Sequence, residues 1–201
     1  MLRVALTGGI ATGKSYVAER LQQRGLPAID ADRLVHELLM PESEAIDPIV
    51  ARFGREVLDE DGSISRRVLG RKVFADPVSR RDLEAILHPR VYDRIHAWFA
   101  TLAGEGRHRV AVADIPLLYE SRREREFDRV IVVACDAEEQ VRRAMKRDHL
   151  PESEARQRLA AQLPIVDKVR RADYVVWTTG THEETDRQVD DIVRTLAAVT
   201  E

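Results

Sequence analysis

The most restrictive feature of this chain is the segment Gly8–Ser15, GGIATGKS, which directly follows the apolar run RVALT at residues 3–7. Glycine inside a helix or strand costs conformational entropy on folding, so three glycines in eight positions indicate that bare backbone is needed there. The segment matches the pattern G-x-x-x-x-G-K-[ST], with Gly13 and Lys14 at its centre. Its place between a predicted strand and a predicted helix is the context that gives this pattern meaning.

A loop of this kind suits a ligand with dense negative charge. Its backbone amides can surround phosphate oxygens, and the helix that follows points its positive end at the same group. Lys14 can reach the β- and γ-phosphates, and Ser15 can bind Mg²⁺. We therefore predict a nucleoside triphosphate site, the alternative being a chance match within a turn. The predicted contact residues are Gly8, Gly9, Ile10, Ala11, Thr12, Gly13, Lys14, Ser15 and Tyr16.

The rest of the chain alternates between apolar runs typical of strands and segments with helical periodicity. Residues 31–104 differ, because their apolar residues recur only at helical spacing, with prolines at 41, 48 and 77 between them. We predict an α/β fold of three layers, with a parallel sheet between helices and a helical insertion after the second strand. The predicted strands are 3–7, 26–30, 109–113, 129–134 and 173–177, and the later helices are 137–149, 152–163, 164–171 and 182–199.

Composition restricts the class of protein. Hydrophobic residues make up 44% of the chain, enough for a core, and the net charge of −3 predicts no general attraction to nucleic acid. Cys135 is the single cysteine, which excludes an internal disulfide and fits a reducing compartment, and we expect it in the core. No apolar run approaches the length of a membrane span and no signal peptide is visible. We expect a cytoplasmic protein.

Three classes of nucleotide-binding protein remain: a kinase for small molecules, a GTPase switch and a remodelling ATPase. The chain has no N-K-x-D stretch to read guanine, and DEDG at 59–62 is better interpreted as a turn than as a GTPase motif. A remodelling ATPase usually has further modules. A kinase needs a phosphate cradle, an acceptor site and cations that close over the transferred group, and candidates for all three are present.

The candidate acceptor residues follow the second strand, as Asp30 and Asp32. Ligands in open α/β sheets gather outside the carboxyl ends of the strands, which brings these carboxylates toward the glycine loop. One could take a proton from an attacking hydroxyl and the other could help to hold Mg²⁺ through water. The alternative for either residue is that it caps the helix beginning near Arg33.

The candidate cations lie late in the chain. Arg143 and Arg147 are four residues apart on one predicted helix face, and Arg156 and Arg158 follow in the next helix. The guanidinium fork can hold phosphate oxygens and relieve negative charge. The alternative is a solvated surface on which these side chains pair with Glu138, Glu139 and Glu154.

Two further motifs are candidates for the site. Asp114 ends a buried strand and is placed to hold Mg²⁺ through water, and the sequence IPLLYE after it, which includes Leu117, indicates a shaped loop. The alternative for Asp114 is a helix cap. His88 precedes a proline inside a helical region, where packing or capping is the alternative to function. Trp98 and Trp177 are expected to pack, although Trp177 ends a strand, where its ring could stack on a base.

In order and spacing, these motifs resemble those of the dephospho-CoA kinases, from residue 4 to about residue 180. The segments that carry the resemblance are ALTGGIATGKS, IDADRLVHE, LHPRV, IPLLYE, QVRRAMKRD, RLAAQ and ADYVV. The resemblance implies transfer of the γ-phosphate of ATP to the ribose 3′-hydroxyl of dephospho-CoA, the last step of coenzyme A synthesis. It also implies the fold of the nucleoside monophosphate kinases. A core of 1–30, 105–140 and 166–201 would then carry an acceptor domain at 31–104 and a lid at 141–165.

The resemblance assigns roles to the candidates. Asp32 would be the base, Lys14 and Ser15 the phosphate and Mg²⁺ ligands, and Arg143 and Arg147 the cations on the lid side. Asp114 is the second candidate Mg²⁺ ligand. The residues expected to contact the acceptor are Asp30, Asp32, His88 and Leu117.

The chain departs from the family where an Asn-containing turn commonly follows the last strand, since Trp177, Thr178 and Thr179 stand there. The selectivity for the nucleotide base is therefore left open, whereas the prediction of phosphoryl transfer is unaffected. The remaining alternatives are another kinase of this fold, or a nucleotide-dependent regulatory module. We expect a monomer that binds ATP and dephospho-CoA, with neither a nucleic acid nor a membrane partner; the sequence leaves an oligomer open.

Overall fold

The computed structural model describes residues 1–199, apart from the side chain of Ala75. Five strands in these residues form one sheet in the order β2-β3-β1-β4-β5. The pairs β1–β3, β1–β4 and β4–β5 are parallel. The predicted fold class, an α/β protein with a parallel sheet, is therefore confirmed. The strands are β1 (Leu2–Gly8), β2 (Ala28–Asp30), β3 (Val110–Asp114), β4 (Arg129–Ala134) and β5 (Tyr174–Trp177).

Helices account for most of the remaining chain, and their bounds lie close to those predicted. Residues 31–104 are mostly helical, as expected, and the DEDG segment is a turn in which the amide of Gly62 donates to the carbonyl of Asp59 at 3.0 Å. The helices are α1 (Lys14–Gln23), α2 (Ala31–Leu38), α3 (Ile46–Phe53), α4 (Arg66–Ala75), α5 (Pro77–Glu105), α6 (Ala137–Asp148), α7 (Glu152–Ala160), α8 (Ile165–Arg170) and α9 (His182–Val199), with short 3₁₀ turns η1 (Arg55–Val57) and η2 (Glu124–Glu126).

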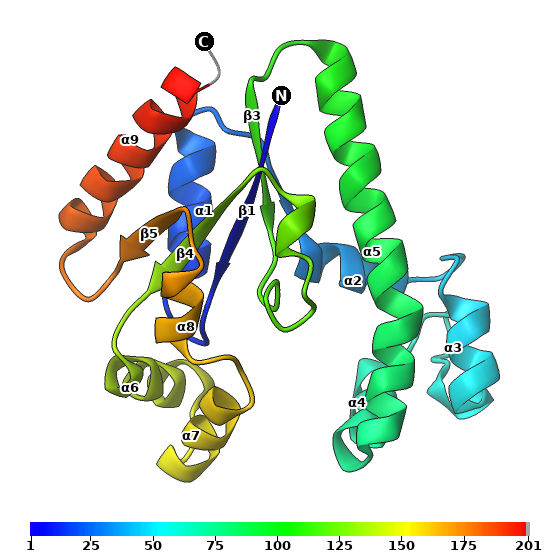
Figure 1. Ribbon diagram of the computed structural model, residues 1–201. Coiled ribbons are helices and arrows are strands. Elements are labelled where there is room, and N and C mark those ends of the chain that lie inside the picture. The colour runs from blue at the N-terminus through cyan, green and yellow to red at the C-terminus, as the bar shows by residue number, and fades with distance from the viewer. Residues whose placement is uncertain (200–201) are drawn as a thin grey trace. The chain divides into compact units, whose positions relative to one another are not determined.

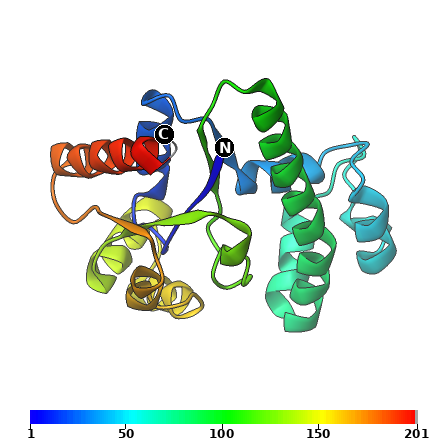
Figure 2. The same cartoon turned by 45° about the horizontal axis from the view of Figure 1, so that its top comes forward.

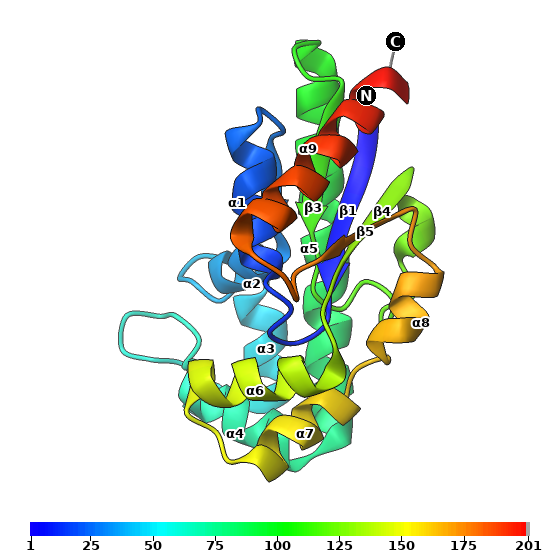
Figure 3. The same cartoon turned by 90° about the vertical axis from the view of Figure 1, so that its left-hand side faces the viewer.

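The sheet lies between two layers of helices. The residues of β4 after Arg129 are all buried and apolar, as expected for a strand covered on both faces. Helices α1 and α9 pack against each other beside the sheet (Figure 2), and α8 contacts β4 from the opposite face (Figure 3). The core between these layers joins Leu6 and Ile131 of the sheet to Leu21 of α1 and Leu196 of α9.

The chain divides into two compact units. The first comprises Met1–Ile29 and Phe99–Glu201, and the second comprises Asp30–Trp98 (Figure 1). The first holds β1, β3, β4 and β5 with α1 and α6 to α9. The second holds α2, α3, α4 and most of α5, and Arg52 of α3 forms an ion pair with Asp82 of α5 at 2.6 Å. The acceptor and lid functions given to segments 31–104 and 141–165 stay predictions.

Two residues test the expected core. Cys135, immediately after β4, is fully buried as predicted, and burial raises the pKa of its thiol. Trp177 is 43% exposed, which contradicts the expectation that it packs, while the alternative that its ring stacks on a base stays a prediction. It ends β5, which is an edge strand of the sheet, and only one neighbouring strand is available to cover it there.

Candidate active site

The glycine loop joins the carboxyl end of β1 to the first residue of α1. Gly13 has a φ of 85°, in the left-handed region that favours glycine, and it stands immediately before the helix. Gly8 lies so close to β4 that a Cβ there would come within 2.7 Å of the carbonyl oxygen of Val133. The sequence requirement for bare backbone therefore has a steric cause at both ends of the loop.

Lys14 and Asp114 come together at this loop. Strand register aligns Leu6 of β1 with Asp114 of β3, so both strands deliver their carboxyl ends to the same edge of the sheet. The ammonium of Lys14 donates to Oδ1 of Asp114, and the two side chains are only 16% and 8% exposed. One cation and one carboxylate are thus held side by side next to the loop amides, although they are 100 residues apart in sequence.

A buried lysine, Lys168, which the sequence analysis did not identify, forms a hydrogen bond to the first residue of the loop. Lys168 of α8 is fully buried, and its ammonium donates to the carbonyl oxygen of Gly8 at 2.9 Å. It also forms an ion pair with Oε1 of Glu120 at 2.8 Å. A buried charge is tolerated only when paired and hydrogen-bonded, as it is here, so the pair fixes the start of the loop against the segment after β3.

The segment after α7 is tied to the same place. The amide of Ile10 donates to Oε1 of Gln162 at 2.9 Å, and the amide of Leu163 donates to Oε1 of Glu120 at 2.9 Å. Ile10 was predicted as a loop residue, but its partner Gln162 was not. The phosphate loop is thus held by polar contacts to two segments from the second half of the chain.

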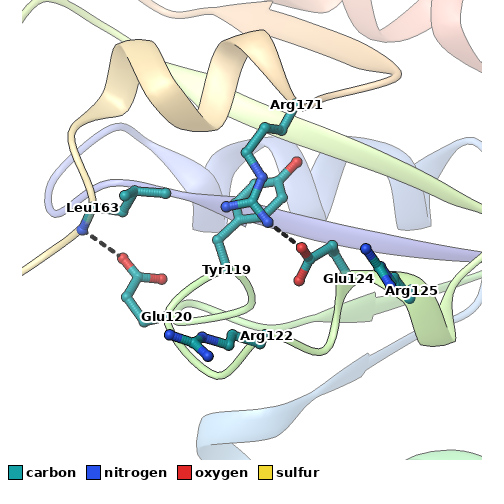
Figure 4. Close-up of a pocket in the computed structure, with 7 residues that line it drawn as sticks. All are labelled: Tyr119, Glu120, Arg122, Glu124, Arg125, Leu163 and Arg171. Atoms are coloured by element: carbon teal, nitrogen blue, oxygen red, sulfur yellow. Dashed lines mark hydrogen bonds and ion pairs between the residues drawn. The ribbon is translucent and has the colours of Figure 1, made fainter.

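Glu120 also borders a cavity of about 710 Å³, whose lining side chains are drawn in Figure 4. Arg171 pairs there with Glu124 and lies 4.3 Å from the centre of the Tyr119 ring. Burial raises the pKa of Tyr119 to about 12, so its phenol stays protonated at neutral pH. Leu117, in the same IPLLYE segment, is 43% exposed.

Thr178, which stands where the family commonly has an Asn-containing turn, also contacts the loop. Its hydroxyl donates to the carbonyl oxygen of Thr12 at 2.7 Å and accepts from Nη1 of Arg143 at 3.0 Å. A cavity of about 240 Å³ lies beside these residues and is lined also by Gly13, Tyr16 and His182. The rings of Tyr16 and His182 are 4.5 Å apart and tilted by 48°. The departure at Thr178 therefore still provides a polar link between the loop and α6.

The arginines of α6 and α7 are paired with nearby carboxylates. Arg143 donates to Glu139 at 2.5 Å as well as to Thr178, and Arg147 pairs with Asp148 at 2.7 Å. Hydrogen bonds from Arg142 and then from Arg143 lower the pKa of Glu139 to about 2, so the carboxylate is ionised at neutral pH. Arg156 and Arg158 match the alternative that these arginines pair with carboxylates on a solvated surface. Arg156 pairs with Glu138 and Glu152, and Arg158 pairs with Glu154 and Asp148.

The other predicted site residues belong to the second unit. Asp30 caps α2, because Oδ1 accepts from the amides of Asp32 at 2.8 Å and of Arg33 at 3.4 Å. The alternative that Asp32 caps this helix is therefore wrong, and its exposed carboxylate lies in the first turn. His88 lies inside α5 next to Pro89, which the helix contains without ending there.

The donor set at the loop fits magnesium bound together with phosphate. No group of three or more His, Cys, Asp or Glu side chains that could hold a metal occurs within residues 1–199. Mg²⁺ prefers oxygen ligands and commonly binds one or two protein oxygens together with substrate phosphates and water. Ser15 at the start of α1 and Asp114 at the end of β3 supply oxygens of that kind.

Among the described residues, none of the helices combines the length and the apolar character needed to cross a bilayer.

Comparison with known proteins gives one consistent result. The family described as Dephospho-CoA kinase matches residues 2–184. A dephospho-CoA kinase of Shouchella clausii is 42% identical over 196 residues, covering 98% of this chain and 99% of that protein.

Solved structures agree over the same length. TT1252 from Thermus thermophilus has 32% identity and a TM-score of 0.81, with 97% of both chains covered. A dephospho-CoA kinase from Campylobacter jejuni has 26% identity and a TM-score of 0.75, with 99% of this chain and 98% of that chain covered. The glycine loop, the Lys14–Asp114 pair and the order of strands and helices thus occur in a chain that is similar to these proteins from end to end. This chain belongs to the dephospho-CoA kinase family.

Proposed function

We propose that this protein transfers the γ-phosphoryl group of ATP to the ribose 3′-hydroxyl of dephospho-CoA. The observation that carries the proposal is the Lys14–Asp114 pair beside the loop amides, in a chain that matches the family over residues 2–184. Phosphoryl transfer requires little covalent work from a protein, so positioning and neutralisation of charge supply most of the catalysis. The residues described above can supply both.

The phosphate side of the reaction belongs to the first unit. The amides of residues 8–15 and the positive end of α1 bind the phosphates, and the ammonium of Lys14 neutralises charge on the β- and γ-oxygens. Asp114, which pairs with Lys14, keeps that ammonium oriented toward the loop. Lys168 holds the carbonyl of Gly8 and so fixes the direction in which the loop begins.

Magnesium is the ion that we propose for this site. Ser15 and Asp114 would hold it together with phosphate oxygens, and when bound it would reduce the negative charge on the transferred group. The protein's own part is to present these two oxygens from the ends of a helix and a strand.

Asp32 is the base that we propose for the acceptor. Its carboxylate can accept the proton of the 3′-hydroxyl as the new P–O bond forms and the bond to the leaving ADP oxygen breaks. Because Asp30 serves as the cap of α2, the carboxylate of Asp32 is not required for that structural role. We assign Asp30, His88 and Leu117 to the contacts with the acceptor on the strength of the family motifs alone.

Arg143 and Arg147 are the cations that we propose to act over the γ-phosphate when helices α6 and α7 close. Closure would exclude water, which otherwise competes with the acceptor for the phosphoryl group. Arg143 is the better supported of the two, since its guanidinium already bonds Thr178 beside the loop. We further propose that the protein is cytoplasmic, since a single buried thiol and no second cysteine fit a reducing compartment, and that it acts as a monomer.

A panel of acceptors tests the proposal. Purified protein is incubated with ATP and magnesium, together with dephospho-CoA, adenosine, shikimate or no acceptor, and ADP release is followed. We expect ADP with dephospho-CoA and a new phosphate at the ribose 3′ position in the product. Hydrolysis at the same rate without any acceptor would instead favour a regulatory ATPase, and phosphorylation of a different acceptor would favour another kinase of this fold.

Asp32→Asn tests the base. We expect kcat to fall about 10²–10³-fold, because general base catalysis typically contributes that much, while the KM for ATP stays near the wild-type value. Asp47→Asn is the matched control, since Asp47 is an exposed acid in the first turn of α3. Full turnover in Asp32→Asn would reject the assignment of the base without affecting that of the phosphate loop.

A further inference from the structure

A cavity of about 420 Å³ lies within the second unit, apart from every residue assigned above. Its lining residues come from the end of α2, the turn at residues 59–63 and the first turn of α4. Apolar side chains of Leu39, Met40 and Ile64 make one part of its lining. The polar residues of the lining are His36, Asp59, Ser63, Ser65, Arg66 and Arg67.

Ser65 is the first sign that the cavity is built for a ligand. It stands at the N-cap position of α4 and is only 5% exposed, yet its hydroxyl makes no capping hydrogen bond. It makes no other side-chain hydrogen bond within residues 1–199 either. An N-cap serine normally accepts from the second or third amide of the helix, and the Ser65 hydroxyl does not do so here. Both the hydroxyl and these amides are thus left available at the cavity.

Charge at the start of α4 points to a negative ligand. The first turn has no acidic residue and begins with Arg66 and Arg67, although cations are unfavourable at the positive end of a helix. Neither arginine forms an ion pair within the described residues, whereas Lys72 on the same helix pairs with Glu56 at 2.9 Å. An arrangement that is locally unfavourable becomes favourable once an anion joins the two guanidinium groups and the helix amides.

We infer that the first turn of α4, with Ser65, Arg66 and Arg67, binds the diphosphate group of the acceptor. The inference rests on the proposed function, because dephospho-CoA carries a diphosphate between its adenosine and its pantetheine arm. Arg66 and Arg67 both line the cavity, so each can pair with one of two linked phosphates, and the apolar side of the cavity suits the uncharged arm that continues from them. His36 faces the same cavity, and Asp59 is the one carboxylate that lines it.

Steady-state kinetics test the inference. The double variant Arg66→Ala/Arg67→Ala is expected to raise the KM for dephospho-CoA about 30-fold, with a much smaller change in the KM for ATP. The KM for adenosine, which lacks the diphosphate, is expected to rise far less than that for dephospho-CoA. Asp59→Asn is expected to change the KM for dephospho-CoA in the opposite direction, lowering it about twofold, because it removes a repelling charge.

Arg71→Ala is the matched control, since Arg71 is an exposed arginine of α4 outside the cavity lining. Melting temperature separates binding from folding. A purely structural role for the two arginines predicts a lower melting temperature in the double variant, whereas the removal of like charges from a helix N-terminus predicts an equal or higher one. An unchanged KM for dephospho-CoA, or an equal rise for adenosine, overturns the inference.

A binding measurement separates this inference from the proposed function. Calorimetric titration with inorganic pyrophosphate is done in a Lys14→Ala background, with and without the two α4 substitutions, so that residual binding at the phosphate loop is common to both. We expect at least tenfold weaker pyrophosphate binding once the α4 arginines are removed. If dephospho-CoA is not phosphorylated but this difference persists, the proposed reaction fails and the anion site stands; equal affinities reject the site.

Discussion

The phosphate loop and the arginine-rich helices α6 and α7 are both polar, but they are organised in opposite ways. The loop is held by partners far away in sequence, as when Lys168 bonds Gly8 across 160 residues and Gln162 bonds Ile10 across 152. The arginines mostly pair within their own helix, as when Arg142 and Arg143 bond Glu139 three and four residues away. Fixed, buried contacts suit a part that must be in place before the substrate arrives, and exposed local pairs suit a part that exchanges partners during the reaction.

The largest effect is expected at the fixed region. Lys14→Ala should lower kcat about 10²–10³-fold, because it removes a preorganised cation from the phosphates in a mostly buried site. ADP release with dephospho-CoA measures the loss. Lys146→Ala on the exposed last turn of α6 is the control and should behave as wild type. If both lysine variants lose turnover equally, the contrast between the two regions disappears.

Lys168→Met should have the next largest effect. It leaves the carboxylate of Glu120 and the carbonyl of Gly8 without their buried partner, which should destabilise the fold by about 3–5 kcal/mol. Thermal unfolding should show a melting temperature lower by about 10 °C, since each kcal/mol shifts a domain of this size by about 2–4 °C.

Kinetics separate support of the loop from general stability. At a temperature where Lys168→Met is folded, we expect a higher KM for ATP and little change in the KM for dephospho-CoA. Lys168→Arg restores a cation and should recover part of the ATP affinity. A variant that melts lower but binds ATP as tightly as wild type would leave Lys168 with a structural role only.

The smallest effect is expected among the arginines. Arg143→Ala should lower kcat about tenfold, because Arg143 reaches the residues beside the loop, whereas Arg156→Ala should change kcat less than twofold. Turnover at saturating ATP and acceptor gives the comparison directly. Equal losses in the two variants would mean that the contact with Thr178 does not distinguish Arg143 from a surface arginine.

The elements of the fold were largely predictable, because their signals are local. The run VIVVA identified β4, and the stripe of Val189, Ile192 and Leu196 identified α9. Gly25, two residues beyond the end of α1, has a φ of 84°, in the left-handed region that marks glycine as a signal for the end of a helix. Trp177 was the exception, since whether a strand-end residue is covered depends on which strands lie beside it, and β5 turned out to be an edge strand.

The candidate site was predictable only in part, and Lys168 shows why. It lies in the segment DKVRRAD, which looks like an ordinary charged helix face. Its burial depends on a carbonyl at Gly8 and a carboxylate at Glu120, and neither is near it in sequence. Lys14, Ser15 and Asp114 were found because each belongs to a motif or ends an apolar strand. The roles of Asp32, Arg147 and His88 stay predictions.

The contacts of Gln162 and Leu163 restrict how α7 can travel. Both follow α7, and both hold the chain that surrounds the phosphates, through Ile10 and Glu120. A swing that carried these two residues along would deprive the Ile10 amide of its acceptor and pull at Glu120. The hinge of any such movement therefore has to lie before residue 162. Helices α6 and α7 can then move toward the phosphates while the glycine loop keeps its position.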